Sequence, residues 1–164
     1  MTCRRLTQAD LPLWREIRLE ALAAYPENYL TTLAEEQAKP DPQVAALLAT
    51  GQVIGSFVAD DLTAVLSLSA QNRAATAHRA WINALYVRPQ WQGSGVAGAL
   101  MTFARACAEA EGRTQLDLYV AADNRRALRF YEKLGFQQCG RIPRAVRLPD
   151  GRYQDDLHLC LMLA

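Results

Sequence analysis

The chain has 164 residues, a length that suits one domain with a substantial buried core. Hydrophobic residues make up 51% and charged residues 21%, which excludes an intrinsically disordered chain. The formal net charge of +1 gives no electrostatic reason to expect nucleic acid or a membrane surface as a partner. No apolar run reaches the roughly 18 residues of a transmembrane helix. We therefore expect one soluble domain over residues 1–164.

Four cysteines are scattered along the chain, and none belongs to a Cys-x-x-Cys pair. They are Cys3, Cys107, Cys139 and Cys160. The polar start of the chain does not resemble the apolar core of a signal peptide. These observations predict reduced thiols in a cytoplasmic protein, with no metal site.

The first third of the chain is expected to be rich in helices. Its elements, in order, are a strand over 3–6, a helix that ends before Pro26, a helix over 32–38 and a helical turn over 41–51. Thr7 and Asp10 form a variant of the capping box that opens the first helix. Asp41 can cap the helical turn, with Pro42 in its first position.

The rest of the chain alternates between β-branched and helical patterns. The expected elements are strands over 53–59, 62–70 and 78–88, a helix over 94–111, a strand over 115–120, a helix over 124–134, and strands over 136–146 and 153–163. The resulting order is β-α-α-β-β-β-α-β-α-β-β. It predicts an α/β fold with a mixed sheet and helices on both faces.

The glycine-rich turn from Gln92 to Ala97 connects the strand ending at Arg88 to the next helix. Backbone N–H groups at a helix start have no partner inside the helix, and the helix dipole leaves partial positive charge there. Glycines let an anion approach these groups closely, so the turn favours a phosphate ligand. A tight strand-to-helix connection would explain the same glycines without any ligand.

The same turn also fits the G-x-G-x-x-G pattern of dinucleotide-binding proteins, over residues 93–98, with Asp117 near the position of the ribose acid. Three departures speak against that interpretation. Four residues, 89–92, separate the pattern from its strand. The preceding strands form an antiparallel meander, and only one further crossover follows. A nicotinamide-dependent oxidoreductase is therefore the less favoured alternative.

Residues 85–136 contain two motifs with fixed spacing. The first is a strand ending in Val-x-Pro, followed by an aromatic residue and Gln/Arg-x-x-Gly-x-Gly/Ala, whose defining positions here are Gln92, Gly95 and Ala97. The second is Asn-x-x-Ala-x-x-x-Tyr-x-x-x-Gly-Phe, which runs from Asn124 to Phe136 with every fixed position occupied. Together the two motifs resemble those of the GNAT superfamily of acetyltransferases. The resemblance implies the acyl-CoA N-acyltransferase fold.

The resemblance also implies the cosubstrate, acetyl-CoA, and the residues that bind it. They are Leu85, Tyr86, Val87, Gln92, Gly93, Ser94, Gly95, Val96, Ala97, Asn124, Ala127 and Tyr131. The backbone from Gln92 to Ala97 would hold the pyrophosphate, and Asn124 would hydrogen-bond the pantetheine arm. Tyr131 would act as general acid and protonate the departing thiolate. No metal is implied.

The predicted reaction is direct attack of a primary amine on the thioester in a ternary complex. The amine could belong to a small molecule, a peptide or a protein, and we expect Tyr29, Trp81 and Tyr153 near it. The general base stays open among Glu35, Asp117, Asp155, Asp156 and His158. A catalytically silent acyl-CoA sensor or scaffold of the same fold is the alternative. The last strands often pair across subunits in this family, which allows a homodimer.

Overall fold

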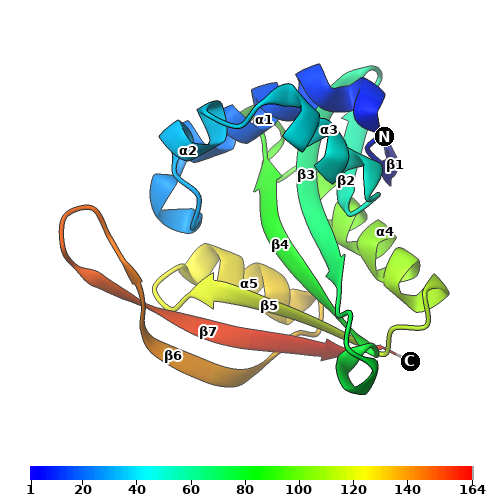
Figure 1. The fold of residues 1–164 in the computed structure, drawn as a ribbon. Coiled ribbons are helices and arrows are strands. Elements are labelled where there is room, and N and C mark those ends of the chain that lie inside the picture. The colour runs from blue at the N-terminus through cyan, green and yellow to red at the C-terminus, as the bar shows by residue number, and fades with distance from the viewer. Residues whose placement is uncertain (164) are drawn as a thin grey trace. The chain divides into compact units, whose positions relative to one another are not determined.

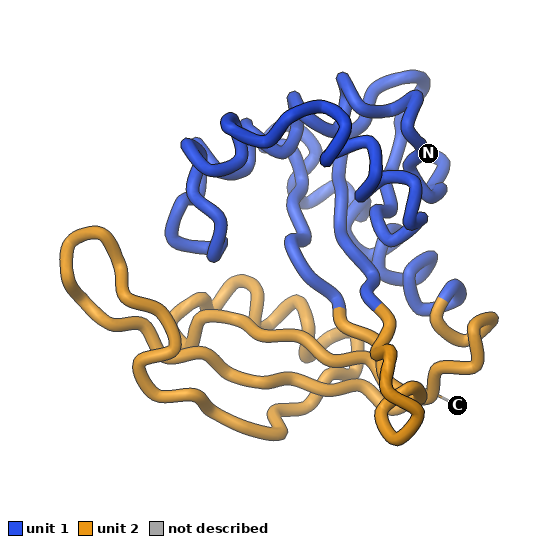
Figure 2. Tube along the Cα trace, viewed as in Figure 1, with its two compact units in different colours: residues 1–69, 82–107 blue, residues 70–81, 108–164 orange. Residues whose placement is uncertain are grey.

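The computed structural model describes residues 1–163, and Ala164, the last residue of the expected domain, lies outside the described part. The chain folds into two compact units, coloured separately in Figure 2. Unit 1 holds residues 1–69 and 82–107, and unit 2 holds residues 70–81 and those from 108 onward. The expectation of a single domain stays a prediction.

Seven strands are hydrogen-bonded in the order β1-β2-β3-β4-β5-β7-β6. Their bounds are β1 Thr2–Arg5, β2 Val53–Val58, β3 Asp61–Ala70, β4 Arg79–Val87, β5 Gln115–Ala121, β6 Gln137–Arg147 and β7 Tyr153–Met162. The ladder between β4 and β5 is parallel, whereas β1 with β2, β2 with β3, β5 with β7 and β6 with β7 pair antiparallel. The predicted α/β fold with a mixed sheet is confirmed.

Unit 1 packs helices on both faces of β2 and β3, whose side chains are buried along most of their length. Its helices are α1 Leu11–Ala24, α2 Leu33–Gln37, α3 Asp41–Ala49 and most of α4 Val96–Ala110. Trp14 and Ile17 of α1 share one hydrophobic cluster with Val44 of α3, Val53 of β2 and Val65 of β3. In Figure 1, α4 lies behind β2 and β3 while α1 and α3 lie in front of them.

The start of α1 and the start of α3 differ in how well the sequence predicts them. The Thr7 and Asp10 capping box is present, and it opens the 3₁₀ turn Gln8–Asp10 that leads into α1. The prediction that Asp41 caps the next turn is wrong. Pro40 is the N-cap, because its extended backbone (ψ 152°) precedes a helix that already includes Asp41. The turn is a full helix, so the element order has one helix more than expected.

Unit 2 packs α5, Arg125–Lys133, on one face of the strands β5, β7 and β6 (Figure 1). The side chains of β5 alternate between two faces, as expected for a strand. Leu116 and Leu118 are buried on the face with Tyr131 and Phe136. Asp117 and Tyr119 point to the opposite face, which we call the polar face of unit 2.

Across residues 1–163, no helix combines the length and the apolar character needed to cross a membrane. The four cysteines carry free thiols.

Candidate functional site

The glycine turn of unit 1 has a backbone that only glycine adopts without strain. Gly93 and Gly95 have φ angles of +80° and +90°, in the left-handed region. A Cβ atom built on either glycine would meet no atom within 4 Å, so the turn presents bare backbone to open space. α4 follows at once and has no acidic side chain in its first turn. The turn therefore suits an anion on electrostatic and steric grounds.

Two of the six predicted backbone donors in this turn already have partners in the preceding 3₁₀ helix Pro89–Trp91. The Gln92 N–H donates to the Pro89 carbonyl (3.2 Å), and the Ser94 N–H donates to the Trp91 carbonyl (3.4 Å). The Gln92 side chain donates to the Val87 carbonyl (3.1 Å) and so holds the turn against the end of β4. The donors best placed for a ligand are those of Gly93, Gly95 and the first residues of α4.

The segment that leads into the turn is anchored to α1. The Tyr86 hydroxyl donates to Glu20 (2.8 Å), and Arg88 pairs with Glu16 (2.6 Å). Tyr86 is buried, and burial followed by its hydrogen bond to Glu20 raises its pKa. Its side chain therefore belongs to the core of unit 1.

Ala84 in the middle of β4 is a functional candidate that could not be predicted from the sequence. Its φ is +53°, a left-handed conformation that costs a non-glycine residue on the order of 1–3 kcal/mol. Ala84 and its neighbour Asn83 are both exposed within an otherwise regular strand. Strain of this kind persists where the surrounding structure imposes it, and it gathers at functional sites. Alanine is an ordinary strand residue, so no sequence pattern marks the position.

In unit 2, the second motif forms the helix predicted for it. The Asn124 side chain accepts the N–H of Ala127 (3.1 Å) and so caps α5. Tyr131 is buried two turns later and packs its ring edge to face against Phe130 and Phe136, with centroids 5.3 and 5.6 Å away. The cap uses one lone pair of the Asn124 carbonyl, so its amide N–H₂ group remains for a ligand.

The three aromatic residues expected near the acceptor lie in different settings. Tyr29 of unit 1 is half-buried, and the guanidinium carbon of Arg18 lies 5.0 Å from the centroid of its ring. Burial raises the pKa of Tyr29 to about 12. In unit 2, Tyr153 is exposed, and the guanidinium carbon of Arg144 lies 5.1 Å from the centroid of its ring. Trp81 stacks on Tyr119, with ring centroids 5.0 Å apart.

Asp117 organises the polar face of unit 2, and its side chain is completely buried there. Its carboxylate accepts two hydrogen bonds from Arg79 (2.9 and 2.8 Å), one from Gln115 (2.9 Å) and one from the His158 Nε2 (2.7 Å). Burial raises the pKa of Asp117, but the hydrogen bonds outweigh it and hold the pKa below its ordinary value. Asp117 is therefore a carboxylate with its acceptor sites filled.

The structure sorts the predicted base candidates. Glu35 caps α2 by accepting from Thr32, and Asp155 is tied to Arg141 (2.6 Å) and the Arg144 N–H (2.8 Å). Glu35 and Asp155 thus serve local structure, and both have lowered pKa values through those bonds. Asp156 accepts from the Gln154 side chain (3.0 Å). His158 remains a candidate base, and its side chain is hydrogen-bonded to Asp117.

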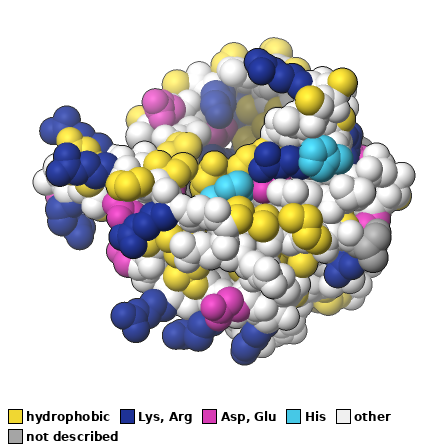
Figure 3. Space-filling view, turned by 90° about the horizontal axis from the view of Figure 1, so that it is seen from below, with side chains coloured by type: hydrophobic (Ala, Val, Ile, Leu, Met, Phe, Trp, Pro, Cys, Tyr) yellow, Lys and Arg dark blue, Asp and Glu magenta, His cyan; other side chains and the backbone are white. Residues whose placement is uncertain are grey.

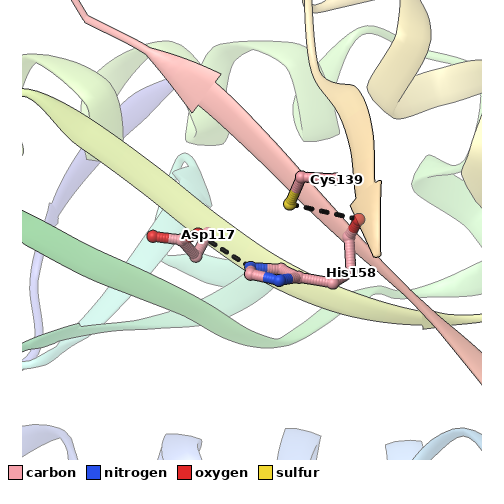
Figure 4. Close-up of side chains that lie close together, drawn as sticks. All are labelled: Asp117, Cys139 and His158. Carbon is pink, nitrogen blue, oxygen red and sulfur yellow. Dashed lines mark hydrogen bonds and ion pairs between the residues drawn. The ribbon is translucent and has the colours of Figure 1, made fainter. Parts of the chain in front are cut away.

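Asp117, Cys139 and His158 bring three donor atoms of metal-ligand type within 4.8 Å of one another (Figure 4). Their chemistry fits a metal ion poorly. The Asp117 oxygens already face the Arg79 guanidinium, and burial raises the pKa of the Cys139 thiol to about 11. A neutral thiol beside a guanidinium is not a ligand set that divalent ions select.

The chain belongs to the GNAT acetyltransferase family, because the family model described as "Acetyltransferase (GNAT) family" matches residues 10–136. This confirms the resemblance drawn from the two motifs. Among curated proteins, the mycothiol acetyltransferase of Brachybacterium faecium is 32% identical over 133 residues, which cover 80% of this chain and 39% of that protein. The mycothiol acetyltransferase of Streptomyces coelicolor is 30% identical over 132 residues, covering 77% and 39% respectively. The chain thus spans well under half the length of these relatives.

Solved structures show the same fold. One is yncA of Salmonella typhimurium, solved with its cofactor acetyl-CoA, with a TM-score of 0.84, 20% identity and coverage of 100% of this chain and 94% of that one. Another is the GNAT acetyltransferase of Streptococcus pneumoniae, with a TM-score of 0.84, 18% identity and coverage of 99% of both chains. At these identities the likeness concerns the fold alone.

Proposed function

We propose that this chain is an N-acetyltransferase that moves the acetyl group of acetyl-CoA to a primary amine. The glycine turn carries the proposal: its left-handed glycines leave bare backbone beside the positive end of α4, where the pyrophosphate would bind. Family membership supports the same assignment. Acetyl-CoA would supply the acyl group in activated form, as a thioester.

The residues around the turn suggest how the rest of the cosubstrate is held. The backbone of Leu85, Tyr86 and Val87 would pair with the pantetheine arm as an added strand would. Within unit 2, the amide N–H₂ group of Asn124, beside Ala127, is proposed as a hydrogen-bond donor to the cosubstrate. We propose the N–H group next to the strained Ala84 as the donor that stabilises negative charge on the thioester oxygen.

Tyr131 is proposed as the general acid. Its ring is fixed by edge-to-face contacts with Phe130 and Phe136, which would hold the hydroxyl in one direction. A phenol at hydrogen-bond distance can protonate the thiolate that leaves when the amine attacks. Such proton transfer typically contributes about 10²–10⁴-fold in rate.

A small soluble amine is the acceptor class that the comparisons favour. The support comes from relatives at 30–32% identity over more than three quarters of this chain, which are named mycothiol acetyltransferases.

The test is product detection by mass spectrometry after incubation with acetyl-CoA and each of four amines: glucosamine, spermidine, cysteine amide and an alanine-initiated peptide. We expect an acetylated product from a small amine, with release of one coenzyme A per product. Binding of acetyl-CoA without any product would favour the sensor, and absence of binding would refute the proposal.

A further inference from the structure

We propose that Glu20 is a positioning residue for this acetyl transfer and that it acts on Ala84 through the side chain of Tyr86. The inference rests on the proposed function, in which the N–H group next to Ala84 donates to the thioester oxygen. Every contact that carries it lies within unit 1. Figure 1 shows the end of β4 beside α1, the helix that contains Glu20.

Both carboxylate oxygens of Glu20 contact residues that follow Ala84 in the chain. Oε1 accepts a hydrogen bond from the Tyr86 hydroxyl (2.8 Å), and Oε2 lies 3.4 Å from the Arg88 Nε. Arg88 also donates its backbone N–H to the Thr63 carbonyl of β3 (3.0 Å). We call Glu20, Tyr86 and Arg88 the β4 clamp, because together they join the end of β4 to α1.

Tyr86 is the buried member of the clamp. It is 4% exposed, and its side chain belongs to the same hydrophobic cluster as Trp14 and Ile17 of α1. Its ring centroid lies 6.2 Å from that of Tyr25. A buried hydroxyl is costly to leave without an acceptor, so the bond to Glu20 is one that the fold retains. On the face shown in Figure 3, by contrast, charged side chains lie at the surface of the molecule, where ion pairs contribute little to stability.

Ala84 lies between two anchored parts of β4. Ile82 is buried before it, and Tyr86 is buried after it. Asn83 and Ala84 are both exposed, so the alternation of side chains that a regular strand shows is interrupted at these two residues. Ala84 has a φ of +53°, and a left-handed alanine inside a strand persists only where the surrounding structure imposes it. The β4 clamp is the anchor on its C-terminal side.

A second left-handed alanine in unit 1 offers a comparison that isolates the clamp. Ala59 has a φ of +52°, but it lies in the turn between β2 and β3. Turns of several types require left-handed residues as part of their own geometry. The two alanines therefore share a backbone conformation for different reasons, and only that of Ala84 should depend on Glu20.

The clamp would act on catalysis through the direction of one N–H group. While Glu20 holds Tyr86, the strand is kept from straightening at Ala84, and the neighbouring N–H group keeps its place. In a released strand, Ala84 would relax toward an extended conformation and the N–H group would turn with it. The loss of one donor to a developing oxyanion typically costs about 10²–10³-fold in kcat. Glu20 thus acts through Tyr86 and not on the substrate.

The first experiment compares two variants that break the clamp with two that keep it. Tyr86→Phe removes only the hydroxyl, and Glu20→Met keeps the length of the side chain but removes the acceptor. Glu20→Gln still accepts from the hydroxyl through its amide oxygen, and Tyr25→Phe removes a neighbouring hydroxyl that is not part of the clamp. We expect kcat to fall at least about tenfold in the first pair and less than about twofold in the second, with the Kd for acetyl-CoA within about twofold in all four.

A second measurement reports the backbone of Ala84 directly. The three-bond NMR coupling between the amide and α protons depends on φ, so it distinguishes a left-handed residue from an extended one. In Tyr86→Phe and Glu20→Met, we expect the coupling of Ala84 to rise toward the value of an extended strand. The coupling of Ala59 should stay the same in every variant, which also shows that unit 1 remains folded.

A double-mutant cycle tests the same link without any measurement of activity. Glycine adopts the left-handed conformation without strain, so Ala84→Gly removes the strain that the clamp maintains. Its effect on the midpoint of thermal unfolding should be more favourable in the wild type than in Tyr86→Phe, where Ala84 has already relaxed. Ala59→Gly is the matched control and should shift the midpoint equally in the two backgrounds.

The outcomes separate the positioning role from the proposed function. An unchanged Ala84 coupling in Tyr86→Phe and Glu20→Met, or an unchanged kcat in both, would overturn the role of Glu20. An equal loss of kcat and of acetyl-CoA affinity would indicate general damage to unit 1 and would also overturn it. If Glu20→Met does not fold, Tyr86→Phe decides, because it removes a single oxygen atom. A wild type that binds acetyl-CoA but acetylates no amine would instead refute the proposed function, and the positioning role with it.

Discussion

The glycine turn of unit 1 offers a ligand its backbone, whereas the polar face of unit 2 offers side chains. Gly93 and Gly95 expose N–H groups because they have no side chain and adopt left-handed conformations. Asp117, Arg79 and His158 come from three strands and meet only when those strands pair. Binding by backbone groups tolerates many side-chain substitutions but is lost when a larger residue replaces a glycine. Binding by side chains is lost when one hydrogen-bonding partner is removed.

The largest expected effect is the loss of acetyl-CoA binding in Gly95→Glu. A glutamate there adds strain at a φ of +90°, fills the open space beside the turn and brings negative charge to the phosphate site. We expect the Kd to rise by more than about a hundredfold in calorimetric titration, a loss of roughly 2.7 kcal/mol or more. Gly151→Glu is the matched control, because Gly151 has a φ of +87° and equally open surroundings in an exposed turn. Unchanged binding by the Gly95 variant would refute the placement of the pyrophosphate.

The next effect is on stability, in Asp117→Asn. The substitution removes a buried charge that binds Arg79, Gln115 and His158, and it should cost about 2–4 kcal/mol in urea unfolding. Asp155→Asn breaks a more exposed ion pair with Arg141 and should cost no more than about 1 kcal/mol. Equal losses in the two variants would show that the Asp117 cluster does not organise unit 2.

The carboxylate of Asp117 should also make the stability of the protein depend on pH. The pKa of Asp117 is lowered from its ordinary value of 3.8 in the folded state, so its contribution to the free energy of unfolding is complete above that value. The contribution is lost as the pH falls through the lower pKa of the folded state. Wild-type stability should therefore fall more steeply below about pH 4 than that of Asp117→Asn. Thermal unfolding between pH 2 and pH 6 checks the slope, and parallel curves would contradict it.

A smaller effect is expected in catalysis from Tyr131→Phe. Phenylalanine keeps the ring contacts with Phe130 and Phe136 but removes the proton donor. We expect kcat to fall at least about tenfold with the Kd for acetyl-CoA unchanged, as measured by product formation and calorimetry. Tyr119→Phe, in an exposed tyrosine on the other face of the strands, should leave acetyl-CoA binding and folding unchanged. Full activity in Tyr131→Phe would remove it from the mechanism.

The smallest effect concerns Gly98, a glycine just outside the turn. It lies in α4 with an ordinary helical backbone, and a Cβ there would meet no atom within 4 Å. Gly98→Ala should therefore raise stability by up to about 1 kcal/mol, since glycine is a poor helix residue. Thermal unfolding measures this gain. A loss of stability would show that Gly98 shares the special backbone of Gly93 and Gly95.

The two regions also differ in how far the sequence predicts them. The turn could be predicted because its chemistry is local, with glycines at fixed spacing between a strand and a helix. The helix that carries Tyr131 and the cap at Asn124 could be predicted for the same reason, whereas the roles of these two residues stay predictions. Strand pairing brings together residues 79, 117 and 158, and short-range sequence patterns do not encode such pairing. For this reason the sequence left Asp117 and His158 as two of five candidate bases. It gave no sign of the contact between Arg79 and Asp117. The strained backbone of Ala84 leaves no mark in the sequence at all.

Above all, we propose that the backbone of Gly93 and Gly95 binds the pyrophosphate of acetyl-CoA. The most direct measurement is a ¹⁵N–¹H NMR titration with acetyl-CoA, in which the nine glycines give signals in a well-separated region. We expect the amide signals of Gly93 and Gly95 to move most, because their N–H groups gain a charged acceptor, while that of Gly151 stays in place. Shifts confined to other glycines, or no shifts at saturating acetyl-CoA, would contradict this placement of the pyrophosphate.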